Sequence, residues 1–123
     1  MSDEISKLPP HVQERLLRFQ QLQQTFQTVL AQKQQVELEK TEVEQTVAEL
    51  QKTADDAVIY KAAGSLLIKA EKAKVTEELI ERQELLNTRS TVLARQEERL
   101  RSQVKEAQAK LQEDLSPISS SLK

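Results

Sequence analysis

The sequence contains no cysteine and no tryptophan, and it has only one glycine, one histidine and three prolines in 123 residues. Without cysteine the chain cannot form a disulfide, a zinc–thiolate site or a thiol nucleophile. With a single glycine it cannot contain a glycine-rich phosphate-binding loop. These absences exclude several large classes of enzyme and cofactor-binding protein.

Large apolar side chains are scarce as well. Aromatic residues make up 2% of the chain and apolar residues 37%, whereas 31% of the residues are charged. This composition does not fill the core of a globular domain, yet the apolar residues recur too regularly for a disordered chain. We therefore expect a mainly α-helical coiled coil, which buries a seam between helices rather than a centre.

No segment has the features of a membrane span, a targeting signal or a nucleic-acid-binding surface. Every apolar run falls far short of the roughly 20 residues that cross a bilayer, and the acidic start Met1-Ser2-Asp3-Glu4 lacks the layout of a signal peptide. The net charge is −2 with both signs interleaved, which disfavours nucleic-acid and membrane partners. We expect a cytoplasmic protein.

The first long tract predicts one continuous helix at about residues 10–54. Pro9-Pro10 suits a helix start, because proline is tolerated in the first turn. Apolar residues then follow a heptad without a skip, and the two seam positions are held by Val12, Phe19, Phe26, Lys33, Lys40, Val47 and Ala54, and by Arg15, Leu22, Val29, Val36, Val43, Leu50 and Ala57. Lys33 and Lys40 interrupt the seam, either to specify register or with their stems covering it and their heads in water.

A second tract predicts another helix at about residues 71–114. Its seam holds Leu79, Leu86, Leu93, Leu100 and Ala107, and its alternate seam is mostly polar, with Arg82, Arg89, Gln96 and Gln103. Pro117 and the serines that follow it favour an end to the helix. We expect the ends of the chain, residues 1–8 and 116–123, to be flexible, and the whole chain to form a single domain.

The segment between the helices differs in kind and predicts a β-hairpin at about residues 57–70. Two short apolar runs flank the only glycine, and they consist of Val58, Ile59 and Tyr60, and of Leu66, Leu67 and Ile68. Gly64 followed by Ser65 suits a type II′ turn, whose first central residue needs a positive φ. The glycine therefore marks the reversal.

A reversal between Gly64 and Ser65 aligns strands and helices with one register. It pairs Tyr60 with Lys69 in the hairpin, and in the helices it sets Leu50, Val43, Val36, Val29 and Leu22 opposite Leu79, Leu86, Leu93, Leu100 and Ala107. Two helices that leave in one direction cannot cover all the apolar residues of the hairpin. We therefore expect hairpins from several copies to pair into a sheet or barrel, with Val58, Ile59, Tyr60, Leu66, Leu67 and Ile68 as assembly residues.

Nothing in the sequence predicts catalysis, a metal site or a bound cofactor. No nucleophile, base and orienting group can be combined into a catalytic set. His11 lies in a first helical turn, where a surface role is expected, and Asp55-Asp56 is a poor cation site that suits a turn better. We expect a protein that is not an enzyme.

The chain resembles the prefoldin family, and in particular its archaeal beta-type subunits. A single hairpin between two helices fits the beta type, and the resemblance covers about residues 8–115. It rests on Asp55-Asp56-Ala57-Val58-Ile59-Tyr60-Lys61, Gly64, Leu66-Leu67-Ile68-Lys69, Arg95-Gln96-Glu97-Glu98-Arg99 and Pro9-Pro10-His11-Val12-Gln13.

The resemblance implies a chaperone subunit that works without ATP. It implies a heterohexamer of two alpha and four beta subunits, a double β-barrel made of hairpins, capture of unfolded proteins at the coiled-coil tips, and delivery to a group II chaperonin. The tip residues that would bind clients are Val12, Leu16, Leu17, Leu111, Leu115 and Ile118.

Other interpretations of the apolar helix ends remain open. Leu16 and Leu17 lie off the heptad seam, so they form a client-binding surface, belong to a frayed coiled-coil end, or serve simple overlap packing. For the chain as a whole, the alternatives to a chaperone subunit are a structural coiled-coil adaptor or tether whose hairpin docks a folded partner, and a membrane-surface protein that uses the apolar N-terminal end.

Overall fold

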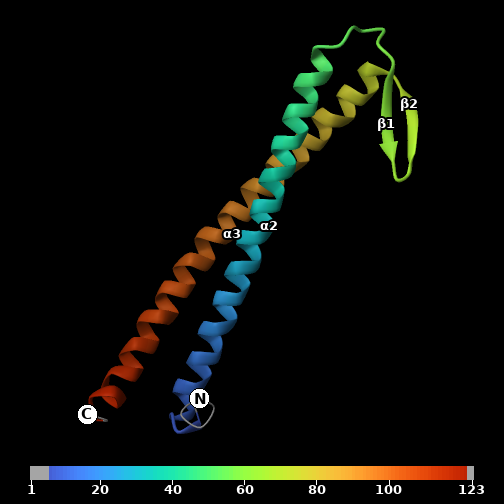
Figure 1. The fold of residues 1–123 in the computed structure, drawn as a ribbon. Coiled ribbons are helices and arrows are strands. Elements are labelled where there is room, and N and C mark those ends of the chain that lie inside the picture. The colour runs from blue at the N-terminus through green and yellow to red at the C-terminus, as the bar shows by residue number, and fades with distance from the viewer. Residues whose placement is uncertain (1–5, 122–123) are drawn as a thin grey trace. The chain divides into compact units, whose positions relative to one another are not determined.

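A computed structural model describes residues 6–121 of the chain, and the side chains of residues 6–116. Figure 1 shows four elements: helix α2 (Pro10–Gln51), strands β1 (Ile59–Ala63) and β2 (Leu66–Ala70), and helix α3 (Lys72–Ser121). The prediction of two long helices with a central β-hairpin is confirmed.

The described chain divides into two compact units. Unit 1 combines the first part of α2, up to Gln32, with the part of α3 that begins at Leu93, and unit 2 comprises Lys33–Val92 with the hairpin. Each unit therefore contains a piece of both helices, and the two pieces pack side by side within that unit.

The core of unit 1 is a narrow apolar seam. Leu22, Val29 and Leu100 are buried in one cluster, against which four half-buried apolar residues pack, namely Phe26, Leu93, Val104 and Ala107. Leu22, Val29, Leu100 and Ala107 all belong to this cluster, as expected for two antiparallel helices that meet along their seams. The Arg101 guanidinium lies 5.8 Å from the centre of the Phe26 ring and adds a cation–π contact.

Unit 2 buries fewer large side chains. Leu50 and Leu86 are buried, and Val43, Val47 and Leu79 are half-buried. Arg82 donates to Glu39 across the two helices at 2.5 Å, and the Ser90 hydroxyl donates to Glu37. Lys33 and Lys40 are half-buried at their seam positions, and the Lys40 ammonium lies 3.7 Å from Glu37.

The hairpin has the predicted register and turn. Tyr60 pairs with Lys69, and Ala63 pairs with Leu66, so that Gly64 and Ser65 form a two-residue turn. Gly64 has a φ of 61°, and Ser65 does not have a positive φ. A two-residue turn in which only the first central residue has a positive φ is a type II′ turn.

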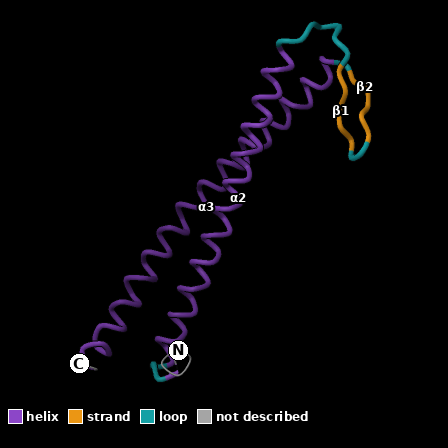
Figure 2. The backbone as a smooth tube through the Cα atoms, viewed as in Figure 1, coloured by secondary structure: helices purple, strands orange, loops and turns teal. Residues whose placement is uncertain are grey.

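Helix α2 ends at Gln51, three residues before the expected end. The amide of Thr53 donates to the Leu50 carbonyl at 3.1 Å, and the Thr53 hydroxyl donates to the same oxygen at 2.6 Å. These bonds satisfy a carbonyl at the end of the helix and turn the chain away. Figure 2 shows the loop that follows and leads to β1, whereas β2 is separated from α3 by Glu71 alone.

Helix α3 departs from the expectation in two respects. It runs on to Ser121 rather than ending near residue 114, although Pro117 within it removes one backbone hydrogen bond. Its second buried row was also incompletely predicted: Arg89 is exposed, whereas a row four residues after the leucine seam is buried or half-buried, and consists of Gln83, Ser90, Glu97, Val104 and Leu111.

Two adjacent leucines of α3 test the seam directly. Leu86 is 0% exposed and Leu85 is 43% exposed. We expect Leu86→Ala to lower the free energy of unfolding by about 2–5 kcal/mol, because it leaves a cavity in the seam. The matched change Leu85→Ala is expected to alter it by no more than about 0.5 kcal/mol. Urea denaturation at one fixed chain concentration measures both, and equal losses would contradict the assignment of the seam.

The turn allows a second test. We expect Gly64→Ala to destabilise the hairpin by about 1–2 kcal/mol, since an L-residue is strained at this positive φ. A side chain would meet no atom within 4 Å, so the cost is conformational rather than steric. Ser65→Ala, at a residue without a positive φ, is the control. Amide hydrogen exchange of β1 and β2 reports the effect, and unchanged protection in Gly64→Ala would refute the turn assignment.

Candidate interaction sites

The hairpin presents an apolar surface that the chain itself leaves uncovered. Five of the six predicted assembly residues are more than half exposed, and the sixth, Ile59, is half-buried. Leu67 is 72% exposed and Tyr60 is 60% exposed; the other three are Val58, Leu66 and Ile68. Four of these side chains lie on the two-stranded sheet, and Val58 directly precedes β1. Large apolar side chains that are exposed to water in this way favour a partner that covers them.

Both faces of the hairpin carry apolar groups. Directly paired residues lie on the same face of an antiparallel sheet, so the register places Ile59, Leu66 and Ile68 on one face and Tyr60 and Leu67 on the other. Neither face is purely polar, and a single flat partner would cover only one of them. The hairpin is therefore suited to partners on both sides.

An ion pair ties the hairpin to α3. The Lys61 ammonium donates to a Glu78 carboxylate oxygen at 2.7 Å. This hydrogen bond and the charge of Lys61 hold the pKa of Glu78 below its usual range. Lys61 shares a face with Leu66 and Ile68, so that face is the one that contacts α3 through its lysine.

A second lysine fastens the loop between α2 and the hairpin. Lys72, in the first turn of α3, donates to the Thr53 carbonyl at 2.7 Å and to Asp55 at 3.3 Å. Its side chain is half-buried, whereas Asp55 is fully exposed. Lys72 thus links the end of α2 to the start of α3 and restricts the directions in which the hairpin can leave.

The helix ends of unit 1 hold the residues predicted at the tips. Arg15 pairs with Asp114 at 2.5 Å, which places the start of α2 beside the last turns of α3. Leu17 is 56% exposed, Leu16 and Leu115 are half-buried, and Val12 and Leu111 are buried. Ile118 lies outside the residues whose side chains the structure describes.

The structure therefore separates the predicted tip residues into two kinds. In this conformation Val12 and Leu111 are part of the seam, and Leu17 faces solvent. The heptad already placed Val12 on the seam, whereas Leu111 belongs to the row of α3 that the sequence pattern did not reveal. The spacing of four residues from Ala107 was the signal for that row.

Several exposed or paired residues were not anticipated from the sequence. Leu38 and Leu85 are exposed apolar residues of unit 2, and Arg82 and Glu39 pair across the helices. The polar contacts between helices depend on side-chain conformations that no repeat in the sequence encodes. A leucine outside the heptad, as Leu38 is, could have been found by the same test that identified Leu17.

The described residues contain no group of three or more His, Asp or Glu side chains placed to hold a metal ion. His11 is exposed on the first turn of α2, as expected. Within the described part of the chain, no helix is long and apolar enough to cross a membrane.

Comparisons with known proteins agree with this architecture. The prefoldin subunit family matches residues 13–117 of the chain. The chain is 45% identical over 109 residues to the prefoldin subunit beta of Methanothrix thermoacetophila, which covers 89% of this chain and 91% of the relative. It is also 45% identical over 113 residues to the prefoldin subunit beta of Archaeoglobus fulgidus, with 92% and 97% covered.

A solved structure shows the same fold. The crystal structure of the prefoldin beta subunit from Thermococcus strain KS-1 superposes with a TM-score of 0.77 at 41% sequence identity, and the match covers 89% of this chain and 96% of that one. The family match spans most of the sequence, and the hairpin between two paired helices is shared. The chain therefore belongs to the prefoldin subunit family, in which it is similar to the beta subunits.

Proposed function

We propose that the chain is a subunit of an ATP-independent chaperone that captures non-native proteins and delivers them to a group II chaperonin. Its partners are an alpha-type prefoldin subunit and further beta copies, in a heterohexamer of two alpha and four beta subunits in the cytoplasm. It performs no catalysis, needs no cofactor, and acts on neither nucleic acid nor membranes. Membership of the prefoldin family supports this function.

The observation that carries the proposal is the uncovered hairpin. Val58, Tyr60, Leu66, Leu67 and Ile68 are all more than half exposed. Pairing of hairpins from several copies into a barrel would bury these side chains and remove the open strand edges. Assembly through the hairpin leaves the helix ends of unit 1 free for clients.

Leu17 is the centre of the proposed client-binding surface. It is exposed on α2 beside the half-buried Leu16, and Leu115 of α3 is half-buried in the same unit. Val12 and Leu111 are buried in the observed conformation, so they are not part of the exposed surface itself. Several such weak apolar contacts on one assembly would hold an unfolded chain by avidity.

Client binding can be tested by a substitution at Leu17. We expect Leu17→Gln to weaken the suppression of aggregation of a denatured client, followed by light scattering, because it removes exposed apolar area without a core defect. Leu38→Gln is the matched control, since Leu38 is 55% exposed on the same helix but belongs to unit 2. Circular dichroism and native mass confirm that both variants fold and assemble.

Equal suppression by wild type and Leu17→Gln would refute the assignment of the client surface. A protein that assembles normally but never suppresses aggregation would instead be the structural adaptor or tether. In that case the helix ends would have no role in holding unfolded chains.

Assembly is tested in the hairpin. We expect Leu67→Asp to abolish the oligomer in native mass spectrometry, because a carboxylate would be buried without a partner in the interface. Ser65→Asp places the same charge at the exposed turn and is expected to leave assembly intact. If both variants still formed the oligomer, the hairpin would not be the assembly site.

A further inference from the structure

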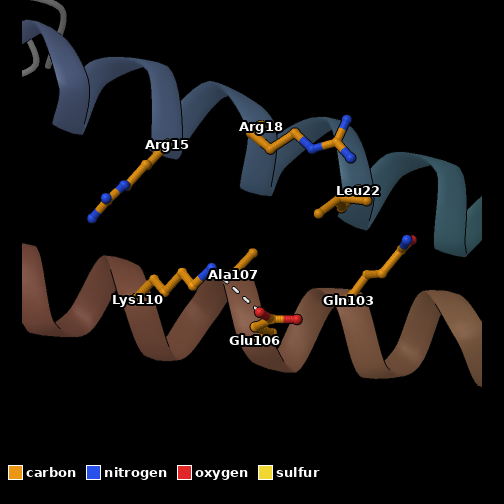
Figure 3. Close-up of a pocket in the computed structure, with 7 residues that line it drawn as sticks. All are labelled: Arg15, Arg18, Leu22, Gln103, Glu106, Ala107 and Lys110. Atoms are coloured by element: carbon orange, nitrogen blue, oxygen red, sulfur yellow. Dashed lines mark ion pairs between the residues drawn. The ribbon is translucent and has the colours of Figure 1, made fainter.

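The paired helix segments of unit 1 border an open hollow, lined by both polar and apolar groups, to which the proposed function assigns no role. It has a volume of about 350 Å³ and lies between α2 and α3, and it is lined by Arg15, Arg18, Leu22, Gln103, Glu106, Ala107 and Lys110. Figure 3 shows Arg15 pointing from α2 toward α3, and Gln103 pointing from α3 toward α2. Three cationic side chains thus surround an apolar floor formed by Leu22 and Ala107.

The three cations differ in how they are paired. Arg15 is held by Asp114 at 2.5 Å, and Lys110 by Glu106 at 3.3 Å. Arg18 makes no ion pair or hydrogen bond within the part of the chain that the structure describes. Its side chain runs along α2 beside Leu22 and does not cross to α3 (Figure 3). Its five N–H donors are therefore available to a ligand.

Arg18 also borders a second hollow, which continues along α2. This one has a volume of about 460 Å³, and its other lining residues carry amides or hydroxyls apart from Leu22, namely Gln21, Gln24, Thr25 and Thr28. The Thr25 and Thr28 hydroxyls donate to carbonyls of their own helix, so Arg18 and the glutamine amides are the side-chain donors left for a ligand. Glutamine amides can both donate to and accept from the backbone of an extended peptide.

We infer that the two hollows form one groove, the Arg18 groove, which binds extended polypeptide segments that carry a carboxylate beside an apolar side chain. The carboxylate accepts from the Arg18 guanidinium, the apolar neighbour rests on Leu22 and Ala107, and the glutamines contact the peptide backbone. The inference rests on the proposed function, since such segments are parts of captured clients. It gives that capture a preference for acidic segments over equally apolar neutral ones.

The charges of the groove set the size of the effect. Asp114 and Glu106 offset two of the three cations, so the net charge around the ligand is that of Arg18 alone. Ion pairs at exposed sites contribute about 0.2–1 kcal/mol, so the preference for an acidic segment is about 1.4- to fivefold. It is expected to disappear at high salt, where exposed charges are screened.

Two labelled peptides test the inference with the full chain in its assembled form. Both are short, unstructured and monovalent, and they have the same sequence except that Asp-Leu pairs in one are Asn-Leu pairs in the other. Fluorescence anisotropy is expected to show about 1.4- to fivefold tighter binding of the Asp peptide. Arg18→Gln is expected to remove this difference and leave the affinity for the Asn peptide unchanged. Arg18→Lys keeps the charge but loses the bidentate hydrogen-bonding geometry of the guanidinium. This variant is expected to retain part of the difference in affinity between the two peptides.

Arg99→Gln is the matched control, because Arg99 is an exposed arginine of the same unit that does not line either hollow. Equal binding of the two peptides by wild type would overturn the inference, and so would an equal loss in Arg18→Gln and Arg99→Gln. If Leu17→Gln weakens both peptides alike while Arg18→Gln changes neither, capture stands and the Arg18 groove does not. If neither peptide binds and aggregation is not suppressed, both the Arg18 groove and the proposed chaperone function are contradicted.

Discussion

Two helices that meet through one short hairpin can bury only the narrow strip along which they touch, and this limit governs the rest of the structure. The strip is made of single buried leucines and valines such as Leu22, Leu86 and Leu100. It has no room for the apolar residues of the hairpin, which stay exposed. A chain of this kind reaches a stable state with much of its large apolar surface still open to a partner.

Because the apolar seam is narrow, polar side chains also help to align the two helices and the hairpin. Arg15 with Asp114 and Arg82 with Glu39 join the two helices, and Lys61 with Glu78 joins the hairpin to α3. Each pair is at least partly exposed, so each contributes little to the free energy of unfolding. The two pairs between α2 and α3 favour the observed antiparallel pairing of the helices, and the third fixes the hairpin against α3.

The sequence predicted the features that follow from repetition and from special backbone geometry. The heptad from Val12 to Leu50 located the seam of α2, and Gly64 located a turn whose positive φ and strand register agree with the structure. The second buried row of α3 was missed because it mixes polar residues, such as Ser90 and Glu97, with apolar ones. A hydrophobic repeat cannot reveal polar residues that are buried only because the other helix packs against them.

Candidate sites were predictable to a lesser degree. The apolar hairpin residues could be named from sequence because nothing in a two-helix chain could cover them. The tip residues could be named only as a group, since the different burial of Val12 and Leu17 depends on how the helix ends pack. Arg18 lacks an ion pair among the residues whose side chains are described, and this depends on side-chain positions that no sequence pattern encodes.

We propose that the hairpin holds the copies together while the helix ends remain free. Hydrogen–deuterium exchange of the chain, before and after assembly with its partner subunit, tests this most directly. Assembly is expected to protect the backbone amides of residues 58–70 strongly and to leave those of residues 12–17 and 111–115 unchanged. Protection at the helix ends with none in the hairpin would contradict it.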